Sequence, residues 1–161
     1  MKARNKYLVA GLMLATAGVS SLALAQMKPE DAIRARQSIM HVMALNFGPV
    51  AAMAQGKIPF NKETFTTDAL RLQSVWQMNP AHYFLPGTDK PVPGSLIPGF
   101  THAKADIWSK PEKFKKAAEH ASEAIDKLAQ ATRPGDEGAM KSAAGGVGKA
   151  CKGCHDDFRS K

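Results

Sequence analysis

The stretch VGKACKGCHDDFR, residues 147–159, sets the architecture of the whole chain. It contains the chain's only two cysteines, Cys151 and Cys154, and His155 follows directly. On a helix these three side chains project from one face within about one turn. Covalent haem attachment requires this C-x-x-C-H spacing, because two thiols add to the vinyl groups and the imidazole reaches the iron from the same side. The motif therefore predicts one haem c, covalently bound through Cys151 and Cys154.

Other uses of Cys151 and Cys154 fit the sequence less well. A disulfide between them would close a very small ring and constrain the unfolded chain far less than a long loop does. A thioredoxin-like dithiol would follow a strand, whereas the pattern around the motif is helical. A zinc site would need distant histidines or acids, because there is no second cysteine pair. A zinc or thiol redox-switch protein is the remoter alternative.

The first 25 residues have the pattern of a cleaved signal peptide. Lys2, Arg4 and Lys6 form a basic region, an uncharged stretch follows over 7–25, and ALA at 23–25 is a small-x-small cleavage pattern. A membrane anchor is the competing interpretation, but the strongly apolar part is shorter than the ~20 residues that span a bilayer. We expect removal of residues 1–25, one domain over 26–161 without a membrane span, and a periplasmic location.

The charge of the chain gives weak information about partners. The signal peptide carries three basic and no acidic residues, so its removal lowers the net charge from +8 to +5. This charge suits an acidic redox partner, which the sequence does not identify, or serves only to keep the protein in solution. Nucleic acid is not an expected partner, because no basic stripe is interleaved with aromatic residues.

Four segments carry apolar residues at the spacing of a buried helix face. The first begins at Pro29 and ends by Gly56, and Pro49 is predicted to kink it or to end it early. The second runs from residue 61 or 63 to 78, the third opens at 109–112, and the fourth covers 137–159. The side chains expected to face inward include Ala44, Phe65, Leu70, Leu72, Phe114, Ile125, Leu128, Met140 and Phe158.

The connections between these segments complete the fold prediction. Ser109 is the predicted N-cap of the third helix, with Glu112 as its capping-box partner. Residues 85–103 hold four prolines and three glycines, a density that no regular element tolerates. No segment shows the alternation of a strand. Four helices with one longer central loop predict an all-α, antiparallel four-helix bundle with the covalent haem in its interior.

The position of His155 limits the second axial ligand. Only six residues follow it, so a sixth ligand comes from upstream or the iron keeps an open side. Met40 on the first helix is the main candidate, although a methionine at such a position more often packs in a core. Surface positions are expected for the other four histidines, His41, His82, His102 and His120. Of these only His102, in the central loop, is a weak alternative ligand.

Arg36 and Gln37 interrupt the apolar face of the first helix, one turn before Met40. A guanidinium on such a stripe is costly unless it pairs with a buried or half-buried anion. A haem propionate would be that anion. The alternative is that Arg36 extends to solvent beside a helix neighbour.

These motifs together resemble the cytochrome c' family, the class II c-type cytochromes. The matching pieces are PEDAI at 29–33, RQ at 36–37, AQGK at 54–57, PGTDK at 86–90, IW at 107–108, VGKAC at 147–151 and the following residues to 159. The resemblance implies that Cys151 and Cys154 carry the haem and that His155 is its single proximal ligand. It also implies that Arg159 lies near the proximal face, and it suggests a homodimer through the first two helices.

The resemblance further implies that Arg36 and Gln37 bind a propionate and that Met40 lies over the distal side of the iron. In the family the residue at this position is usually bulky, apolar and not bonded to iron, which leaves a five-coordinate haem that admits NO or CO. Relatives with the same fold use a methionine of this helix as a sixth ligand and act as low-spin electron carriers. We expect the five-coordinate form, with Met40 as distal ligand the alternative.

The expected function is therefore electron transfer, binding of small gases, or both, without substrate turnover. An enzyme such as a peroxidase would need polar distal groups placed to cleave a peroxide bond. Met40 and Phe47 on the first helix offer none. The redox partner and the balance between gas binding and electron flow are not encoded in any motif of the chain.

Overall fold

The computed structural model describes residues 27–92 and 101–160. The expected signal peptide at 1–25 and part of the central loop lie outside these residues. Four long helices and two short ones follow one another in the order α1 (Pro29–Ala54), α2 (Lys62–Trp76), η1 (Pro80–Tyr83), α3 (Asp106–Ser109), α4 (Pro111–Ala131) and α5 (Glu137–Phe158).

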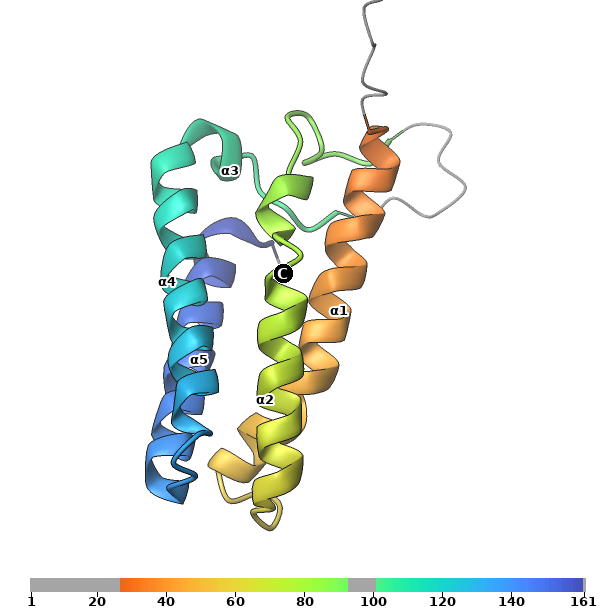
Figure 1. Cartoon of the computed structure of the whole chain (residues 1–161). Helices are drawn as coiled ribbons and strands as arrows, with labels where there is room; N and C mark the ends of the chain where they lie inside the picture. The colour runs from red at the N-terminus through yellow and green to blue at the C-terminus, as the bar shows by residue number, and fades with distance from the viewer. Residues whose placement is uncertain (1–26, 93–100, 161) are drawn as a thin grey trace, which may run out of the picture.

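The four long helices form an antiparallel bundle, as the sequence predicts (Figure 1). Helix α1 packs against α2 and α5, and α4 packs against the same two helices, so each long helix has two neighbours. Neighbouring helices run in opposite directions. Within the two described ranges there is no strand, and no helix is both long and apolar enough to cross a membrane.

Local capping signals explain where α2 and α5 begin and where α1 ends. The Asn61 side chain accepts a hydrogen bond from the Thr64 N–H at 2.8 Å, and the Asp136 carboxylate accepts one from the Ala139 N–H at 2.7 Å. These bonds satisfy first-turn donors of α2 and α5 that have no partner inside the helix. Gly56 ends α1 with a φ of 70°, a conformation that glycine adopts at little cost.

The structure decides two points about helix ends. Helix α1 continues through Pro49 to Ala54, so of the two predicted effects of this proline, a kink or an early end, the early end does not occur. Ser109 does not cap α4 either, because it is the last residue of α3, a short helix that the sequence does not reveal. Lys110 occupies the N-cap position without a side-chain hydrogen bond, and its own N–H donates to the Asp106 carbonyl and so closes α3.

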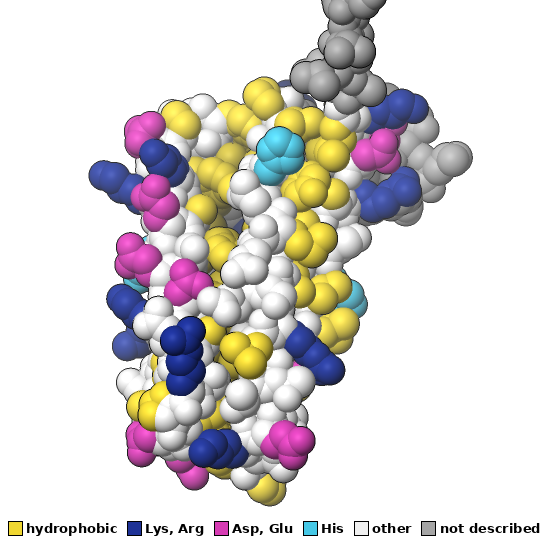
Figure 2. All heavy atoms as spheres, in the orientation of Figure 1, with side chains coloured by type: hydrophobic (Ala, Val, Ile, Leu, Met, Phe, Trp, Pro, Cys, Tyr) yellow, Lys and Arg dark blue, Asp and Glu magenta, His cyan; other side chains and the backbone are white. Residues whose placement is uncertain are grey.

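The core lies between the four long helices. Its largest fully buried side chains include Phe65, Met53, Leu72, Ile125, Leu128 and Met140. Two residues predicted to face inward are exposed instead, Ala44 on α1 and Leu70 on α2. Leu70 and Leu72 are two positions apart, which on a helix places them on different faces. Figure 2, in the orientation of Figure 1, shows hydrophobic side chains at the surface of the molecule, including along α1.

The end of α5 is tied to the central loop. Arg159 and Ala103 form an isolated antiparallel bridge. The Lys104 N–H donates to the Phe158 carbonyl at 2.9 Å, and the Ser160 N–H donates to the His102 carbonyl at 2.7 Å. These bonds fix the returning loop against the helix that carries the cysteines.

Candidate haem site

The three residues of the attachment motif lie on the last turns of α5. Cys151 and Cys154 are half-buried and unpaired, and Cys151 packs against the hydrophobic core. His155 is exposed. The helix therefore holds two accessible thiols and an imidazole within one turn, which is the donor set that haem c requires.

The local environment keeps these groups neutral. Burial raises the pKa of Cys151, and burial together with the charges of Cys151 and Asp157 raises the pKa of Cys154 to about 11. Burial and the charge of Arg159 lower the pKa of His155, against an opposing effect of Asp156. A neutral imidazole is the form that binds a metal.

The same pKa directions do not favour a thiol switch. Reactive cysteines act as thiolates and have lowered pKa values, whereas both thiols here are shifted upward. Among the residues that the structure describes, no group of three or more histidines, cysteines or acids is assembled for a metal ion. Neither finding supports the zinc or redox-switch alternative.

Arg36 is buried, with only 3% of its surface exposed. The alternative that it extends to solvent is therefore wrong. Its guanidinium donates to the Tyr83 carbonyl, to the hydroxyl and carbonyl of Thr88, and to the Thr101 hydroxyl. Burial lowers the pKa of Arg36 to about 10, and the charge of Asp89 opposes that shift. The acceptors that its burial demands are thus supplied by the protein itself.

The other predicted residues of α1 lie beside Arg36. Gln37 is exposed. Met40, one turn further along, is partly buried and packs against the hydrophobic core. Because α1 and α5 pack against each other, the fold brings this set of residues onto a helix next to the one that carries Cys151 and His155.

Arg159 lies near His155: its N–H donates to the His155 carbonyl at 3.0 Å, and its charge lowers the pKa of that imidazole. It is exposed and held in the bridge with Ala103. The four remaining histidines are exposed, as predicted: His41, His82, His102 and His120.

An aromatic row next to the motif is absent from the sequence-based prediction. The rings of Phe84 and Phe114 are 5.0 Å apart, and those of Phe114 and Phe158 are 5.2 Å apart. Phe158 follows His155 by three positions, so this row ends at the turn that carries the motif. The apolar spacing of α4 and α5 predicts that Phe114 and Phe158 face inward. It does not indicate Phe84, which belongs to a distant segment of the chain.

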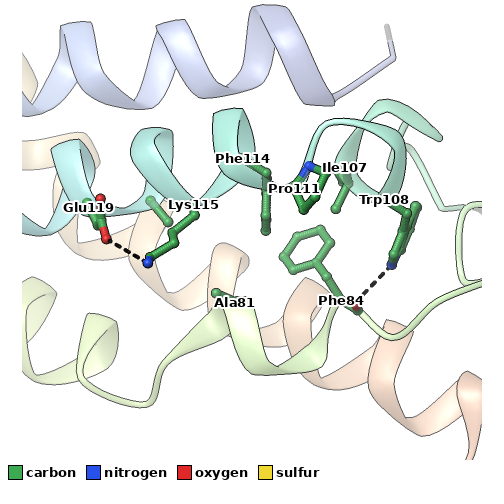
Figure 3. Close-up of a pocket in the computed structure, with 9 residues that line it drawn as sticks. Ala81, Phe84, Ile107, Trp108, Pro111, Phe114, Lys115 and Glu119 are labelled. Atoms are coloured by element: carbon green, nitrogen blue, oxygen red, sulfur yellow. Dashed lines mark hydrogen bonds and ion pairs between the residues drawn. The ribbon is translucent and has the colours of Figure 1, made fainter.

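Phe84 and Phe114 also line an apolar groove of about 380 Å³ (Figure 3). The Trp108 indole N–H donates to the Phe84 carbonyl at 3.1 Å and so joins α3 to the segment after η1. The Lys115 and Glu119 side chains, 3.9 Å apart, lie at the α4 side of the groove. The remaining lining residues are Ala81, Ile107, Pro111 and Ala118.

Comparisons with known proteins agree with this architecture. A family model described as Cytochrome C' matches residues 31–159. Cytochrome c' of Rubrivivax gelatinosus is 44% identical over 135 residues, which cover 83% of this chain and 98% of that one. A crystal structure of cytochrome c' from Rubrivivax gelatinosus has a TM-score of 0.74 and 42% identity, and covers 83% of this chain and 98% of that chain.

Two solved structures of cytochrome c prime variants from Alcaligenes xylosoxidans carry gas ligands. One is a nitric oxide complex and the other has carbon monoxide bound. Each has a TM-score of 0.71 and 32% identity; they cover 83% of this chain and 97% and 98% of their own chains.

An antiparallel helical bundle with C-x-x-C-H on its last helix defines a bundle-type c cytochrome. The chain belongs to the cytochrome c' family, to which its match extends over nearly the whole described length. This family binds haem c covalently, and the two cysteines of the chain have the spacing for that attachment. The predicted fold and cofactor are thereby confirmed.

Proposed function

We propose that this protein is an exported haem c protein that transfers electrons and binds small gases at a five-coordinate iron. The observation that carries the proposal is the placement of Cys151, Cys154 and His155 on one turn of α5 in a cytochrome c' bundle. When haem c is attached, the two thiols would hold the porphyrin and His155 would be the protein ligand of the iron. Export follows from the signal peptide proposed at 1–25, with the domain over 26–161 working in the periplasm.

The packing of Met40 supports an open distal position. Met40 packs against the hydrophobic core, which suits a side chain that covers a porphyrin face by van der Waals contact. Related proteins bind nitric oxide and carbon monoxide, and we assign the same ligand class to this chain.

Haem iron supplies a redox couple and a coordination site for a diatomic gas. The residues of this chain bind, orient and shield it. Cys151 and Cys154 would fix the porphyrin to α5. Partial desolvation and the charge of Arg159 lower the pKa of His155, which favours its neutral, metal-binding form. We place Arg36 and Gln37 at the propionate rim. Substrate turnover is not part of the proposal, because Met40 offers no acid–base group on the distal side.

The ferric absorption spectrum of the haem-loaded protein tests this function. We expect a high-spin ferric haem that stays attached during acid–acetone extraction, and a ferrous form that binds carbon monoxide. The high-spin state follows from a weak axial field when only His155 bonds to the iron. A low-spin ferric spectrum with a sulfur-to-iron band near the red edge would show instead that Met40 is the sixth ligand and the protein a plain electron carrier.

A homodimer through α1 and α2 is part of the same proposal. Val42 and Leu45 on α1 are 41% and 62% exposed, and Leu70 on α2 is 44% exposed. Helices α1 and α2 pack against each other. Apolar side chains on an exposed helix pair are typical of a self-complementary interface, and two-fold dimers are the commonest oligomers.

Leu45→Glu is expected to convert the dimer to a monomer. In a two-fold interface the substitution acts twice, and each copy loses ~1.5–3 kcal/mol of apolar burial. The dissociation constant should therefore rise by more than about a hundredfold. Sedimentation velocity at micromolar concentration measures the change. Ala139→Glu, which adds the same carboxylate at an exposed position of α5, is the control and should stay dimeric; a wild-type protein that sediments as a monomer would refute the dimer.

A further inference from the structure

We propose that Arg36 is a positioning residue that clamps both sides of the central loop and, through Phe84, sets the turn of α5 that carries the haem. This role goes beyond the proposed function, because it concerns how the chain holds itself around the cofactor. It also differs from a direct charge interaction with a propionate.

The hydrogen bonds of Arg36 use all four terminal N–H groups of the guanidinium. One nitrogen donates to the Tyr83 carbonyl at 3.2 Å and to the Thr88 hydroxyl at 2.5 Å. The other donates to the Thr88 carbonyl at 2.5 Å and to the Thr101 hydroxyl at 2.7 Å. Since each terminal nitrogen carries two hydrogens, every one of them has a protein acceptor.

These acceptors lie near the two ends of the proline- and glycine-rich segment 85–103. Thr88, near its start, is fully buried and donates its own hydroxyl proton to the Leu85 carbonyl at 2.7 Å. Thr101 lies near its end, and its hydroxyl also accepts from the Ala103 N–H at 3.1 Å. One side chain of α1 therefore fixes where the loop leaves the bundle and where it returns.

Arg36 also contacts the first ring of the aromatic row formed by Phe84, Phe114 and Phe158. The guanidinium carbon of Arg36 lies 4.7 Å from the centre of the Phe84 ring, a cation–π contact. Phe84 contacts Phe114, which contacts Phe158, three positions after His155. Packed rings thus connect Arg36 to the end of the helix that carries the haem-attachment motif.

The positive charge of Arg36 and the hydrogen-bonding geometry of its guanidinium can be tested separately by substitution. Asp89, on the loop, favours the charged form of Arg36 against its burial, and at a pKa of about 10 the side chain is protonated at neutral pH. Lysine would keep the positive charge, but it has one nitrogen and cannot present the planar fork that reaches acceptors on two sides. Arg36→Lys therefore removes the clamp and keeps the charge.

Amide hydrogen exchange on the haem-loaded protein tests the clamp. Arg36→Lys, Arg36→Met and Thr88→Val should each raise exchange in peptides covering 84–92 and 101–105 by about tenfold, since each removes buried hydrogen bonds. Peptides from the middle of α4 should not change. The matched control is Thr132→Val, because Thr132 is also buried and its hydroxyl donates only to the nearby Ala129 carbonyl at 2.7 Å.

The ferric absorption spectrum is the second readout. A positioning role predicts that Arg36→Lys and Thr88→Val shift the haem bands in the same direction, although Thr88→Val removes no charge. A direct charge interaction with a propionate predicts a shift in Arg36→Met alone. Loop protection retained in Arg36→Lys, Thr88→Val behaving like Thr132→Val, or an unchanged spectrum in both variants would overturn the proposal. The exchange readout is independent of iron coordination, so failure of the five-coordinate assignment leaves it intact.

Discussion

The double variant Cys151→Ala/Cys154→Ala is expected to be exported without any covalent haem. Without thiols, no thioether bond to the vinyl groups can form. Because we place the cofactor in the interior of the bundle, where it would bind the folded chain, its loss should also destabilise the protein. Each kcal/mol of lost stability lowers the melting temperature by roughly 4 °C in a domain of this size. Haem content after acid–acetone extraction and thermal unfolding by circular dichroism measure both effects.

Lys152→Ala is the control for this experiment. Lys152 lies between the two cysteines, is exposed, and forms an ion pair with Asp156, so its removal should leave haem attachment intact. Covalent haem in the double variant would refute the assignment of both cysteines. A double variant that stays as stable as the wild type would show that the haem is not part of the packed interior.

The bundle is predictable because its signals are local. The Asn61 and Asp136 caps, the proline at the start of α1 and the glycine after it all act within one or two turns. Together with apolar spacing they give four helices of nearly the observed lengths. The failure at Ser109 has a physical reason: the extra turn of α3 uses that residue, and it is fixed by the distant contact between Trp108 and Phe84.

The haem-binding motif is equally local, whereas the partners of Arg36 are not. The cost of burying a guanidinium correctly predicts that Arg36 needs oxygen acceptors. It cannot tell a propionate from Thr88 and Thr101, which are 52 and 65 positions away. The row from Phe84 to Phe158 is hidden for the same reason, since no spacing rule connects segments so far apart.

The outward position of Leu70 shows the limit of apolar spacing itself. Leu70 and Leu72 have the same side chain, and both lie on α2 with only Arg71 between them. One is 44% exposed and the other 1% exposed. Leu70, which the apolar spacing wrongly assigns to the core, belongs to the exposed apolar surface that we propose for the dimer. An apolar residue that the pattern misplaces can therefore indicate an interface.

The distal side of the haem depends on what Met40 does. It follows Arg36 by one turn on α1, so the two side chains share a face of the helix. A thioether there can bond to the iron, at about 2.3 Å by analogy with other metal–sulfur bonds. It can also pack on the porphyrin at about 3.5 to 4 Å. The contact of Met40 with the hydrophobic core favours packing.

Met40→Ala is therefore expected to speed carbon monoxide binding to the ferrous haem while the ferric haem stays high-spin. Removal of the side chain opens the distal space, and a tenfold faster rate corresponds to about 1.4 kcal/mol of activation free energy. Stopped-flow mixing with carbon monoxide and the ferric absorption spectrum are the measurements. Met43→Ala is the matched control, because Met43 is a buried core residue on the same helix and its loss should lower stability without changing the binding rate. Conversion of a low-spin haem to a high-spin one by Met40→Ala would instead identify Met40 as the sixth ligand.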